Sequence, residues 1–328
     1  MNSHGLRMGS VAQGRGTRVA IMTDETGWHT RELQRALRER DCSGRCLDLE
    51  ECRVDTTQSW HGLVLPGFSN GLPDAVLVRG IAGGSFEQVT RRLGILHALR
   101  ELGVPVYNDA RAIERSVDKA MTSLLLHAAG VPTPPTWAME SPALAQRLVT
   151  SESAARRSLV LKPLFGSQGK GLQRIGWIAG THVPLPPLAG DYGGLAYLQR
   201  FVEPSTQPGH DWRVLVVGGR AVAAMRRVSE HWIHNVAQGA RCEPQSLRAG
   251  AGAGAELAGL AQAAAQALDM DYAGIDLLPT PHGIQVLEVN GVAAWHGLQR
   301  VASVDIARAI VDDLLDRRLA ALAARRHA

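Results

Sequence analysis

Two acids and one amide near the carboxyl end of the chain have the types and spacing of a metal site. Asp276 interrupts the apolar run 274–278, and Glu288 and Asn290 alternate within the run 286–290. Residues two apart in a strand share a face, and a hairpin partner brings Asp276 beside them. Three oxygen ligands on one face suit Mg²⁺. The alternative is a solvated hairpin face, although an unpaired acid inside an apolar strand is costly to bury.

Lys162 offers a second chemical group, because it ends the apolar run 158–162 and precedes the Gly/Ser-rich loop 166–171. A lysine beside free backbone N–H groups can bind a polyphosphate. The loop has neither the G-x-x-x-x-G-K-[ST] order of a P-loop nor a G-x-G-x-x-G fingerprint. An ordinary hairpin turn therefore explains the loop, taken alone, equally well.

Arginines on both sides of a Gly-Gly turn form a third group. Arg213 lies in the apolar run 212–217, and Arg226 and Arg227 follow the turn at 218–219. Cross-strand arginines can hold a phosphoryl group or an acyl phosphate through paired hydrogen bonds. The alternative is a basic sheet face that aids solubility. Arg213 is the stronger candidate because its strand is apolar, whereas one of Arg226 and Arg227 has to face water.

Alternating apolar and amphipathic stretches predict the elements that position these groups. Residues 17–108 read as strand, helix, strand, helix, strand, which is a small parallel α/β domain. Arg79 directly follows one strand and His29 precedes a helix, so both are expected at the carboxyl edge of the sheet, where such folds place ligands. Residues 1–16 are rich in Gly, Ser and Arg and are expected to form a disordered leader.

The remainder of the chain predicts two α+β lobes, 109–190 and 191–328, with the metal site in the second. Repeated Pro and Gly cannot sustain a helix or a strand, so such a stretch is expected to connect elements. The expected elements are a helix over 112–129, a connection between the lobes over 181–194, a helix over 255–268, antiparallel strands joined by a turn at 280–283, and a closing amphipathic helix over 304–326.

The composition is that of an ordinary globular protein. The 328 residues are 45% hydrophobic, and the net charge of +4 comes from 35 Lys and Arg against 31 Asp and Glu, without a long basic run. Aromatic residues make up only 5% and do not alternate with basic ones, so no nucleic-acid partner is expected. No run approaches the ~20 apolar residues of a membrane span. The cysteines form no C-x-x-C pair, which favours a reducing, cytoplasmic location.

Taken in order, the motifs of residues 75–310 resemble the ATP-grasp superfamily, and within it the RimK-like α-L-glutamate ligases. Six blocks in the family's order are far more specific than any one of them. The resemblance implies an N-terminal parallel α/β (pre-ATP-grasp) domain and two α+β lobes that clamp ATP. The matching blocks are YNDARAIERSVDKAMTSLLLHAAGVPTPPT, VLKPLFGSQGKGL, YLQRFVEP, DWRVLVVGGRAVAAMRRV, AGIDLL and VLEVN.

The resemblance also implies roles for individual residues. ATP and Mg²⁺, with Mn²⁺ as an alternative ion, are the expected cofactors, and Asp276, Glu288 and Asn290 match the metal ligands. Arg200 departs from the family, which often has an acid there. The other matches are Lys119 and Lys162 facing the phosphates, Gln199, Arg200, Phe201 and Val202 as the hinge for adenine, Asp211 as a ribose or phosphate contact, Arg213 and Arg227 holding the acyl phosphate, and Asn235 as a further ligand.

The implied reaction is attack of a carboxylate on the γ-phosphate, followed by attack of an amine on the acyl phosphate. The phrases TGWHTREL and WHGLQ are closest to tetrahydromethanopterin glutamate ligases. That resemblance implies L-glutamate and a pterin with a carboxylate as substrates. Trp295 would then stack on the acceptor beside His296, and Arg79 or His29 would pair a carboxylate. The alternative is a structural role for each residue, in which Trp295 packs a hinge and His29 caps its helix.

Two other functions stay open at this stage. The acceptor can instead be a protein or peptide C-terminus, as in ribosomal-protein glutamate ligases, which the basic surface mildly favours. A non-catalytic ATP-binding protein of the same fold is the second, although the full set of phosphate and metal ligands argues against it. Homo-oligomers are frequent in this architecture, and a membrane partner is not expected.

Overall fold

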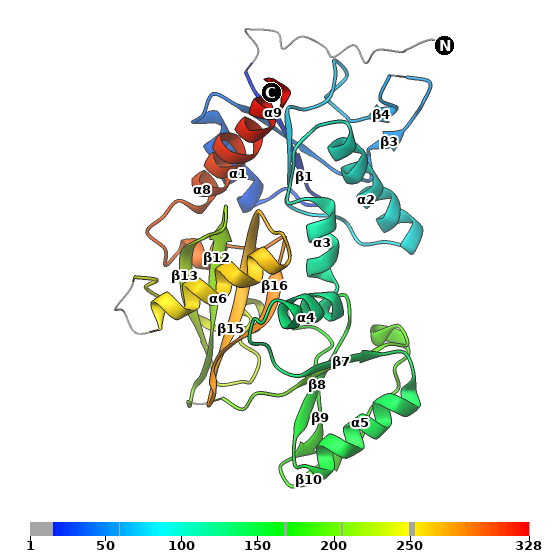
Figure 1. Cartoon of the computed structure of the whole chain (residues 1–328), viewed down its shortest axis with the longest axis vertical. Coiled ribbons are helices and arrows are strands. Elements are labelled where there is room, and N and C mark those ends of the chain that lie inside the picture. The colour runs from blue at the N-terminus through cyan, green and yellow to red at the C-terminus, as the bar shows by residue number, and fades with distance from the viewer. Residues whose placement is uncertain (1–15, 59, 167–168, 205, 249–252, 328) are drawn as a thin grey trace.

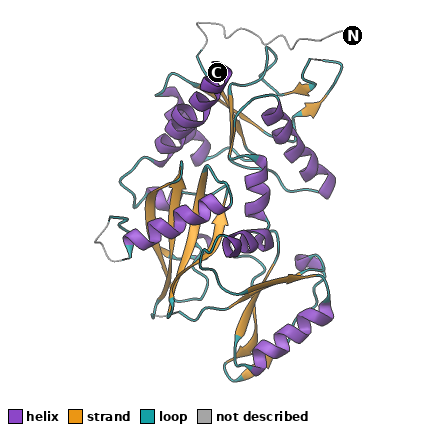
Figure 2. Cartoon of the chain, in the orientation of Figure 1, coloured by secondary structure: helices purple, strands orange, loops and turns teal. Residues whose placement is uncertain are grey.

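The computed structural model describes residues 16–58, 60–166, 169–204, 206–248 and 253–327. In these residues the strands build three main sheets, stacked along the long axis of the molecule with helices packed against them (Figures 1 and 2). Of the predicted leader, only Gly16 lies within the described residues. None of the described helices is long and apolar enough to cross a lipid bilayer.

The N-terminal sheet is parallel, with the order β2-β1-β5-β6. Val19 and Ile21 of β1 pack against one helix and Ala20 and Met22 against another, so both faces are covered. The apolar pattern does not predict the edge strand β2, because its sequence is polar and half exposed. The elements are β1 (Arg18–Met22), α1 (Trp28–Arg38), β2 (Ser43–Leu47), a hairpin of β3 (Arg53–Val54) and β4 (Leu63–Val64), β5 (Ala75–Val78), α2 (Phe86–Glu101) and β6 (Val106–Tyr107).

The stretch predicted as one helix over 112–129 is two helices, α3 (Ala110–Val117) and α4 (Lys119–Ala128). Asp118 lies between them with extended dihedrals, φ −82° and ψ 102°, and its carboxylate accepts hydrogen bonds from the first N–H groups of α4. An aspartate in this position caps a new helix instead of continuing the previous one. The break fixes Lys119 as the first residue of α4.

The central sheet is antiparallel, with the order β10-β9-β8-β11-β7. The stretch 181–194, predicted to connect the lobes, lies within this part instead, because the chain returns through β11 between β8 and β7. The sheet therefore extends to Arg200, beyond the predicted boundary at 190. The elements are β7 (Thr136–Met139), α5 (Pro142–Ala154), β8 (Ser158–Lys162), β9 (Gln173–Ile178), β10 (Thr181–Val183), a 3-10 turn (Gly190–Tyr192) and β11 (Ala196–Arg200).

The C-terminal sheet is antiparallel, with the order β14-β13-β12-β15-β16. The expected hairpin of the last two strands is confirmed, with Asp276 opposite Glu288. The Ala-rich α6 covers one face of the sheet (Figure 1). The elements are β12 (Gly209–Val217), β13 (Arg220–Ser229), a 3-10 turn (Val236–Gln238), β14 (Arg241–Pro244), α6 (Gly254–Ala267), β15 (Tyr272–Thr280), β16 (Gly283–Asn290), α7 (His296–Gln299), α8 (Ile306–Asp313), a π-helical segment (Leu314–Leu319) and α9 (Ala320–His327).

The N-terminal and C-terminal sheets share one hydrophobic core. Ile21 of β1 and Leu37 of α1 belong to the same buried cluster as Tyr272, Trp295 and Leu314. Helix α8 packs beside α1 at this junction (Figure 1). The central sheet has a separate core beneath α5.

Asn108, directly after β6, ties the two sheets together through a fully buried side chain. Its Nδ2 donates to the carbonyl oxygens of Tyr272 at 2.7 Å and Gly291 at 2.6 Å. Its Oδ1 accepts from the N–H groups of Asp271 at 2.7 Å and Tyr272 at 3.0 Å. Both donors and both lone pairs of the amide are thus used.

His29 holds the same junction from α1. Its Nε2 accepts hydrogen bonds from the backbone N–H groups of Trp295 at 3.1 Å and His296 at 3.2 Å, so this nitrogen carries no proton. Burial, together with the positive charge of Arg79 and the neighbouring His296, lowers the pKa of His29 to about 4.

Replacing Asn108 by Ala is expected to lower the free energy of unfolding by about 3 kcal/mol or more, because buried N–H and C=O groups lose their partners. Urea unfolding followed by circular dichroism measures the change. Asn70→Ala, at an exposed loop position, is the matched control and should stay within about 0.5 kcal/mol of the parent. Equal losses in both variants would contradict the role given to Asn108.

The pKa of His29 predicts a pH dependence of stability. Its folded-state pKa of about 4 lies below the ordinary value of 6.5, so the unfolded state takes up the proton first as the pH falls. Stability is therefore lost between about pH 6.5 and pH 4, and His29→Gln should reduce that slope. His127→Gln, exposed on α4, is the control and should keep it. Urea unfolding midpoints measured across this pH window test the prediction. If stability falls with the same slope against pH in the parent and in His29→Gln, the assignment to His29 is refuted.

Candidate active site

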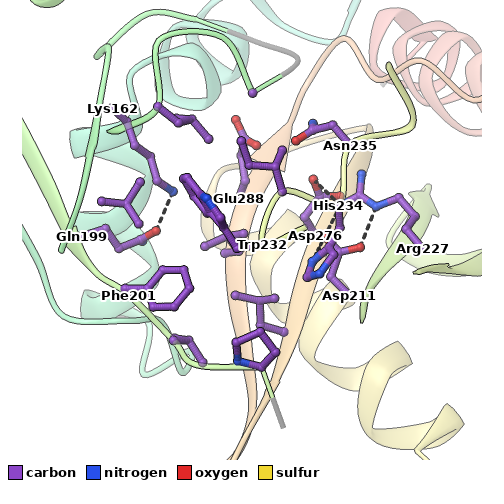
Figure 3. Close-up of a pocket in the computed structure, with 18 of the residues that line it drawn as sticks. Lys162, Gln199, Phe201, Asp211, Arg227, Trp232, His234, Asn235, Asp276 and Glu288 are labelled. Atoms are coloured by element: carbon purple, nitrogen blue, oxygen red, sulfur yellow. Dashed lines mark hydrogen bonds and ion pairs between the residues drawn. The ribbon is translucent and has the colours of Figure 1, made fainter. Parts of the chain in front are cut away.

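A cavity lies between the central sheet and the C-terminal sheet. One wall presents Lys162, Gln199 and Phe201, and the facing wall presents Asp276 and Glu288. Figure 3 shows these side chains directed toward the space between the two walls. Other predicted residues that line the cavity are Lys119, Arg200, Val202, Asp211, Arg227 and Asn235.

Two lysines hold positive charge on the central-lobe side. Lys162, at the end of β8, donates from Nζ to Oε1 of Gln199 at 2.7 Å. Lys119, at the start of α4, donates to the carbonyl oxygens of Gly166 at 2.7 Å and Leu164 at 3.3 Å. Burial lowers the pKa of Lys162 to about 8 and also lowers that of Lys119, while the carboxylate of Glu288 opposes both shifts.

Residues 199–202, which end β11 and begin the segment after it, line the cavity between the two sheets. Gln199 is 1% exposed and also donates to the hydroxyl of Thr136. Arg200 turns its guanidinium away to Glu152 of α5, with hydrogen bonds of 2.9 Å and 3.1 Å. The ring of Phe201 lies 5.7 Å from that of Trp232 in an edge-on arrangement. The carboxylate of Glu152 therefore neutralises the guanidinium of Arg200.

A chain of buried charges crosses the C-terminal sheet. Arg213 donates to both oxygens of Asp276 at 2.7 Å, and Arg227 donates to both oxygens of Asp211 at 2.7 Å and 2.5 Å. Nη2 of Arg227 also lies 3.1 Å from Oδ2 of Asp276. The register explains the pairs, because Arg213 is opposite Asp276 and Asp211 is opposite Arg227. Arg226 faces elsewhere, toward Glu243.

The two aspartates of this chain titrate in opposite directions. Burial raises the pKa of Asp211 to about 6, despite the guanidinium of Arg227. For Asp276, burial is outweighed by Arg213 and Arg227, which together hold its pKa below the ordinary value. Nη1 of Arg227 is buried and makes no hydrogen bond within the described residues. Arg227 thus keeps one N–H donor that has no protein acceptor among the described residues.

The predicted metal ligands fit a hard cation that also binds nucleotide oxygens. Oδ1 of Asp276 accepts one hydrogen bond and Glu288 accepts none within the described residues, so lone pairs remain on both. Among the residues that the structure describes, the Asn290 side chain makes one hydrogen bond, from Nδ2 to the carbonyl of Gly274 at 3.4 Å. No group of three His, Cys, Asp or Glu side chains in the described chain can hold a metal by itself. This donor set suits Mg²⁺, which keeps waters and phosphate oxygens as ligands.

The loop after β13 completes the cavity opposite the glycine loop. A Cβ on Gly169 would lie 3.0 Å from a methyl group of Ile233 and 3.1 Å from Oδ1 of Asn235, so the two loops touch. Trp232 and His234 line the cavity as well, and the sequence prediction did not include them. The only signal available was the aromatic cluster HWIH between two predicted strands.

The residues predicted to meet the substrate gather at the domain junction instead of in this cavity. The guanidinium of Arg79 lies 5.1 Å from the centroid of the Trp295 ring, and its Nη1 donates to the carbonyl of Val292 at 3.1 Å. Trp295 is 1% exposed, so its ring offers no open face for stacking on an aromatic acceptor. His296 is exposed and its ring contacts that of Trp28, with centroids 4.6 Å apart and the planes tilted by 36°.

Comparison with protein-family models identifies two adjoining domains. Residues 17–113 match the RimK PreATP-grasp domain, and residues 116–314 match the RimK-like ATP-grasp domain. The two models together span most of the chain and meet within α3.

Individual relatives agree with the family models. A tetrahydromethanopterin:alpha-L-glutamate ligase of Methanococcus maripaludis is 30% identical, over 91% of this chain and 98% of the relative. A probable alpha-L-glutamate ligase of Thioalkalivibrio sulfidiphilus is also 30% identical, over 90% of this chain and 94% of the relative.

Solved structures show the same fold. The ATP-grasp ligase PsnB, complexed with a minimal precursor, Mg and ADP, superposes with a TM-score of 0.65 at 21% identity, covering 91% of this chain and 97% of PsnB. The arrangement of the parallel N-terminal sheet and the two antiparallel sheets is therefore a known fold. On these grounds the chain belongs to the RimK-like ATP-grasp family and is a ligase that forms carbon–nitrogen bonds.

Proposed function

We propose that the protein joins the amine of L-glutamate to a small-molecule carboxylate, using ATP and Mg²⁺ and an acyl-phosphate intermediate. One observation carries the proposal: cations and oxygen ligands face one another across a single cavity, with Lys162 and Gln199 on one wall and Asp276 and Glu288 on the other. A nucleotide with its metal requires both kinds of group within one site.

Each wall has a distinct part in the proposed reaction. Lys119 and Lys162 bind the phosphates, while Asp276, Glu288 and Asn290 would hold Mg²⁺, which neutralises phosphate charge when bound. The acceptor carboxylate attacks the γ-phosphorus, and the bond from that phosphorus to the bridging oxygen breaks to release ADP. The amine then attacks the acyl carbon, and phosphate leaves. No side-chain nucleophile is required, so positioning and charge neutralisation supply the catalysis.

Arg213 and Arg227 are proposed to hold the acyl phosphate and the oxyanion formed from it. Arg227 has an unpaired Nη1 in the cavity wall for this purpose. Asp211, first expected to contact ribose or phosphate, has both oxygens on Arg227. Its proposed role is therefore to orient that guanidinium, with Asn235 as the further ligand from the neighbouring loop.

The adenine is proposed to lie against the strand end 199–202. The backbone there, the ring of Phe201 and the side chain of Val202 supply the contacts. Arg200 takes part through its backbone, because Glu152 holds its guanidinium. Trp232, edge-on to Phe201, adds an aromatic wall that the sequence motifs did not assign.

A pterin bearing a carboxylate is the proposed acceptor class, supported by tetrahydromethanopterin:alpha-L-glutamate ligases among the relatives. The rings of Trp28 and His296 lie 4.6 Å apart at an interplanar angle of 36°, and both side chains are at least partly exposed, so they replace Trp295 as the proposed contact for an aromatic acceptor.

A screen of candidate acceptors with ATP and L-glutamate tests this function. Release of ADP should require both substrates, and the product should gain the mass of glutamate residues. Pterin carboxylates should be modified, whereas peptides and cell-lysate proteins should not. Glutamate ladders on protein C-termini without modified pterins would overturn the acceptor class while leaving the ligase chemistry intact.

Glu288→Gln is expected to reduce acceptor-dependent ADP release by about 100-fold or more, because a neutral amide binds the divalent ion poorly and the phosphate charge is left uncompensated. Glu256→Gln, exposed on α6, is the matched control and should retain full turnover. Equal turnover of the two variants at saturating Mg²⁺ would remove Glu288 from the metal site.

A further inference from the structure

The cavity of the candidate active site is smaller than the ligand proposed for it. Its free volume is about 110 Å³, whereas protein sites that hold a small molecule usually enclose roughly 300–1,000 Å³. ATP contains a purine base, a sugar and three phosphate groups, so it needs a site within that range. At least one group that lines the cavity must therefore move before a nucleotide enters.

Several side chains around the cavity are held by a partner from the same lobe. Lys162 of β8 donates its hydrogen bond to Gln199 of β11 in the same sheet. Phe201 is held as well, because the guanidinium of Arg174 of β9 lies 3.8 Å from the centroid of its ring. Moving any of these side chains would break a contact within the central lobe.

Trp232 differs from these side chains, because it lies outside the strands and its ring is held only loosely. It belongs to the loop between β13 and the 3-10 turn at 236–238 and is partly exposed. Among the residues that the structure describes, its indole N–H donates no hydrogen bond. The ring lines the cavity and meets the ring of Phe201 edge-on, with centroids 5.7 Å apart. Figure 3 shows it directed into the space between the two walls.

The loop that carries Trp232 reaches across the cavity at two points. Trp232 meets Phe201 at the end proposed for the base. Ile233 and Asn235 lie against Gly169 of the glycine loop, at the end proposed for the phosphates. A loop that follows a strand of the C-terminal sheet therefore contacts the central lobe along the length of the proposed nucleotide site.

We propose that Trp232 gates the nucleotide site. In the arrangement described above its ring takes up part of the slot beside Phe201, where the base of the nucleotide is proposed to lie, and the ring swings aside before the nucleotide binds. Indole and purine are both flat fused ring systems, so a slot that accepts one by stacking also accepts the other. The inference rests on the proposed nucleotide site and adds a step that precedes binding.

The gate lowers the rate of nucleotide association. Only molecules whose Trp232 ring has left the slot can bind, so the apparent association rate constant is reduced by the fraction of such molecules. A contact between two aromatic rings favours the closed arrangement by roughly 2- to 12-fold. Once the nucleotide has bound, the same ring lies against the base as the aromatic wall proposed above and slows dissociation. Removal of the ring therefore raises both rate constants.

Stopped-flow fluorescence with mant-ADP, a fluorescent derivative of ADP, and Mg²⁺ measures both rate constants without turnover. Trp232→Ala should raise the association rate constant about 5-fold and should also raise the dissociation rate constant, measured by a chase with unlabelled ADP. Trp232→Phe keeps a ring in the slot and should stay close to the parent. Trp60→Ala removes an exposed tryptophan that does not line the cavity and is the matched control. Association that is unchanged or slower in Trp232→Ala would overturn the gate and assign the enlargement of the cavity to a movement of the sheets.

A crystal structure of the ADP complex provides the second test. The Trp232 ring should have left its edge-on position beside Phe201 and should lie against the bound base. A complex in which ADP is bound and the ring keeps its present position would overturn the gate and leave the nucleotide site intact. Failure of mant-ADP to bind the parent in the presence of Mg²⁺ would overturn the nucleotide site, and the gate with it, so the two failures are distinguishable.

Discussion

Charge neutrality inside the C-terminal sheet is the constraint on which the site depends. Arg213, Asp276, Arg227 and Asp211 are linked in one chain, and most of their surface is buried. Removing one member would leave an uncompensated buried charge, which typically costs 3–5 kcal/mol. The pairing needs all three strands β12, β13 and β15 in their observed register, so the fold of this sheet and the electrostatics of one cavity wall come from the same contacts.

Several features of the site were predictable from single residues. Asp276 and Glu288 break apolar strands, and acids are retained in such positions when they have ligands or partners, so their pairing across β15 and β16 followed from strand periodicity. Lys162 was identifiable because it ends an apolar strand before a glycine loop. These are local patterns. The pairing of Asp276 with Glu288 could be predicted because the two strands of the hairpin are close together in the sequence.

Other features depend on partners distant in the sequence, which no local pattern contains. The helix break at Asp118 is an exception, because its carboxylate accepts from the nearby N–H groups of Ala120 and Met121 and the signal was therefore local. The position of Arg200 depends on Glu152 in α5, and the burial of Trp295 depends on a core shared with α1 and β1. β2 forms because β1 offers it an edge, since its own sequence lacks the apolar alternation of a strand.

Asn108 and the core around it have a consequence for how the cavity can change shape. The N-terminal sheet, the junction loops and the C-terminal sheet form one continuous packed body, whereas the core of the central sheet is separate. One wall of the cavity, with Asp276 and Glu288, therefore belongs to this packed body, whereas the wall with Lys162 belongs to a part that has its own core. A shift of the central sheet against this body would change the separation of Lys162 from Asp276 and Glu288 without breaking either core.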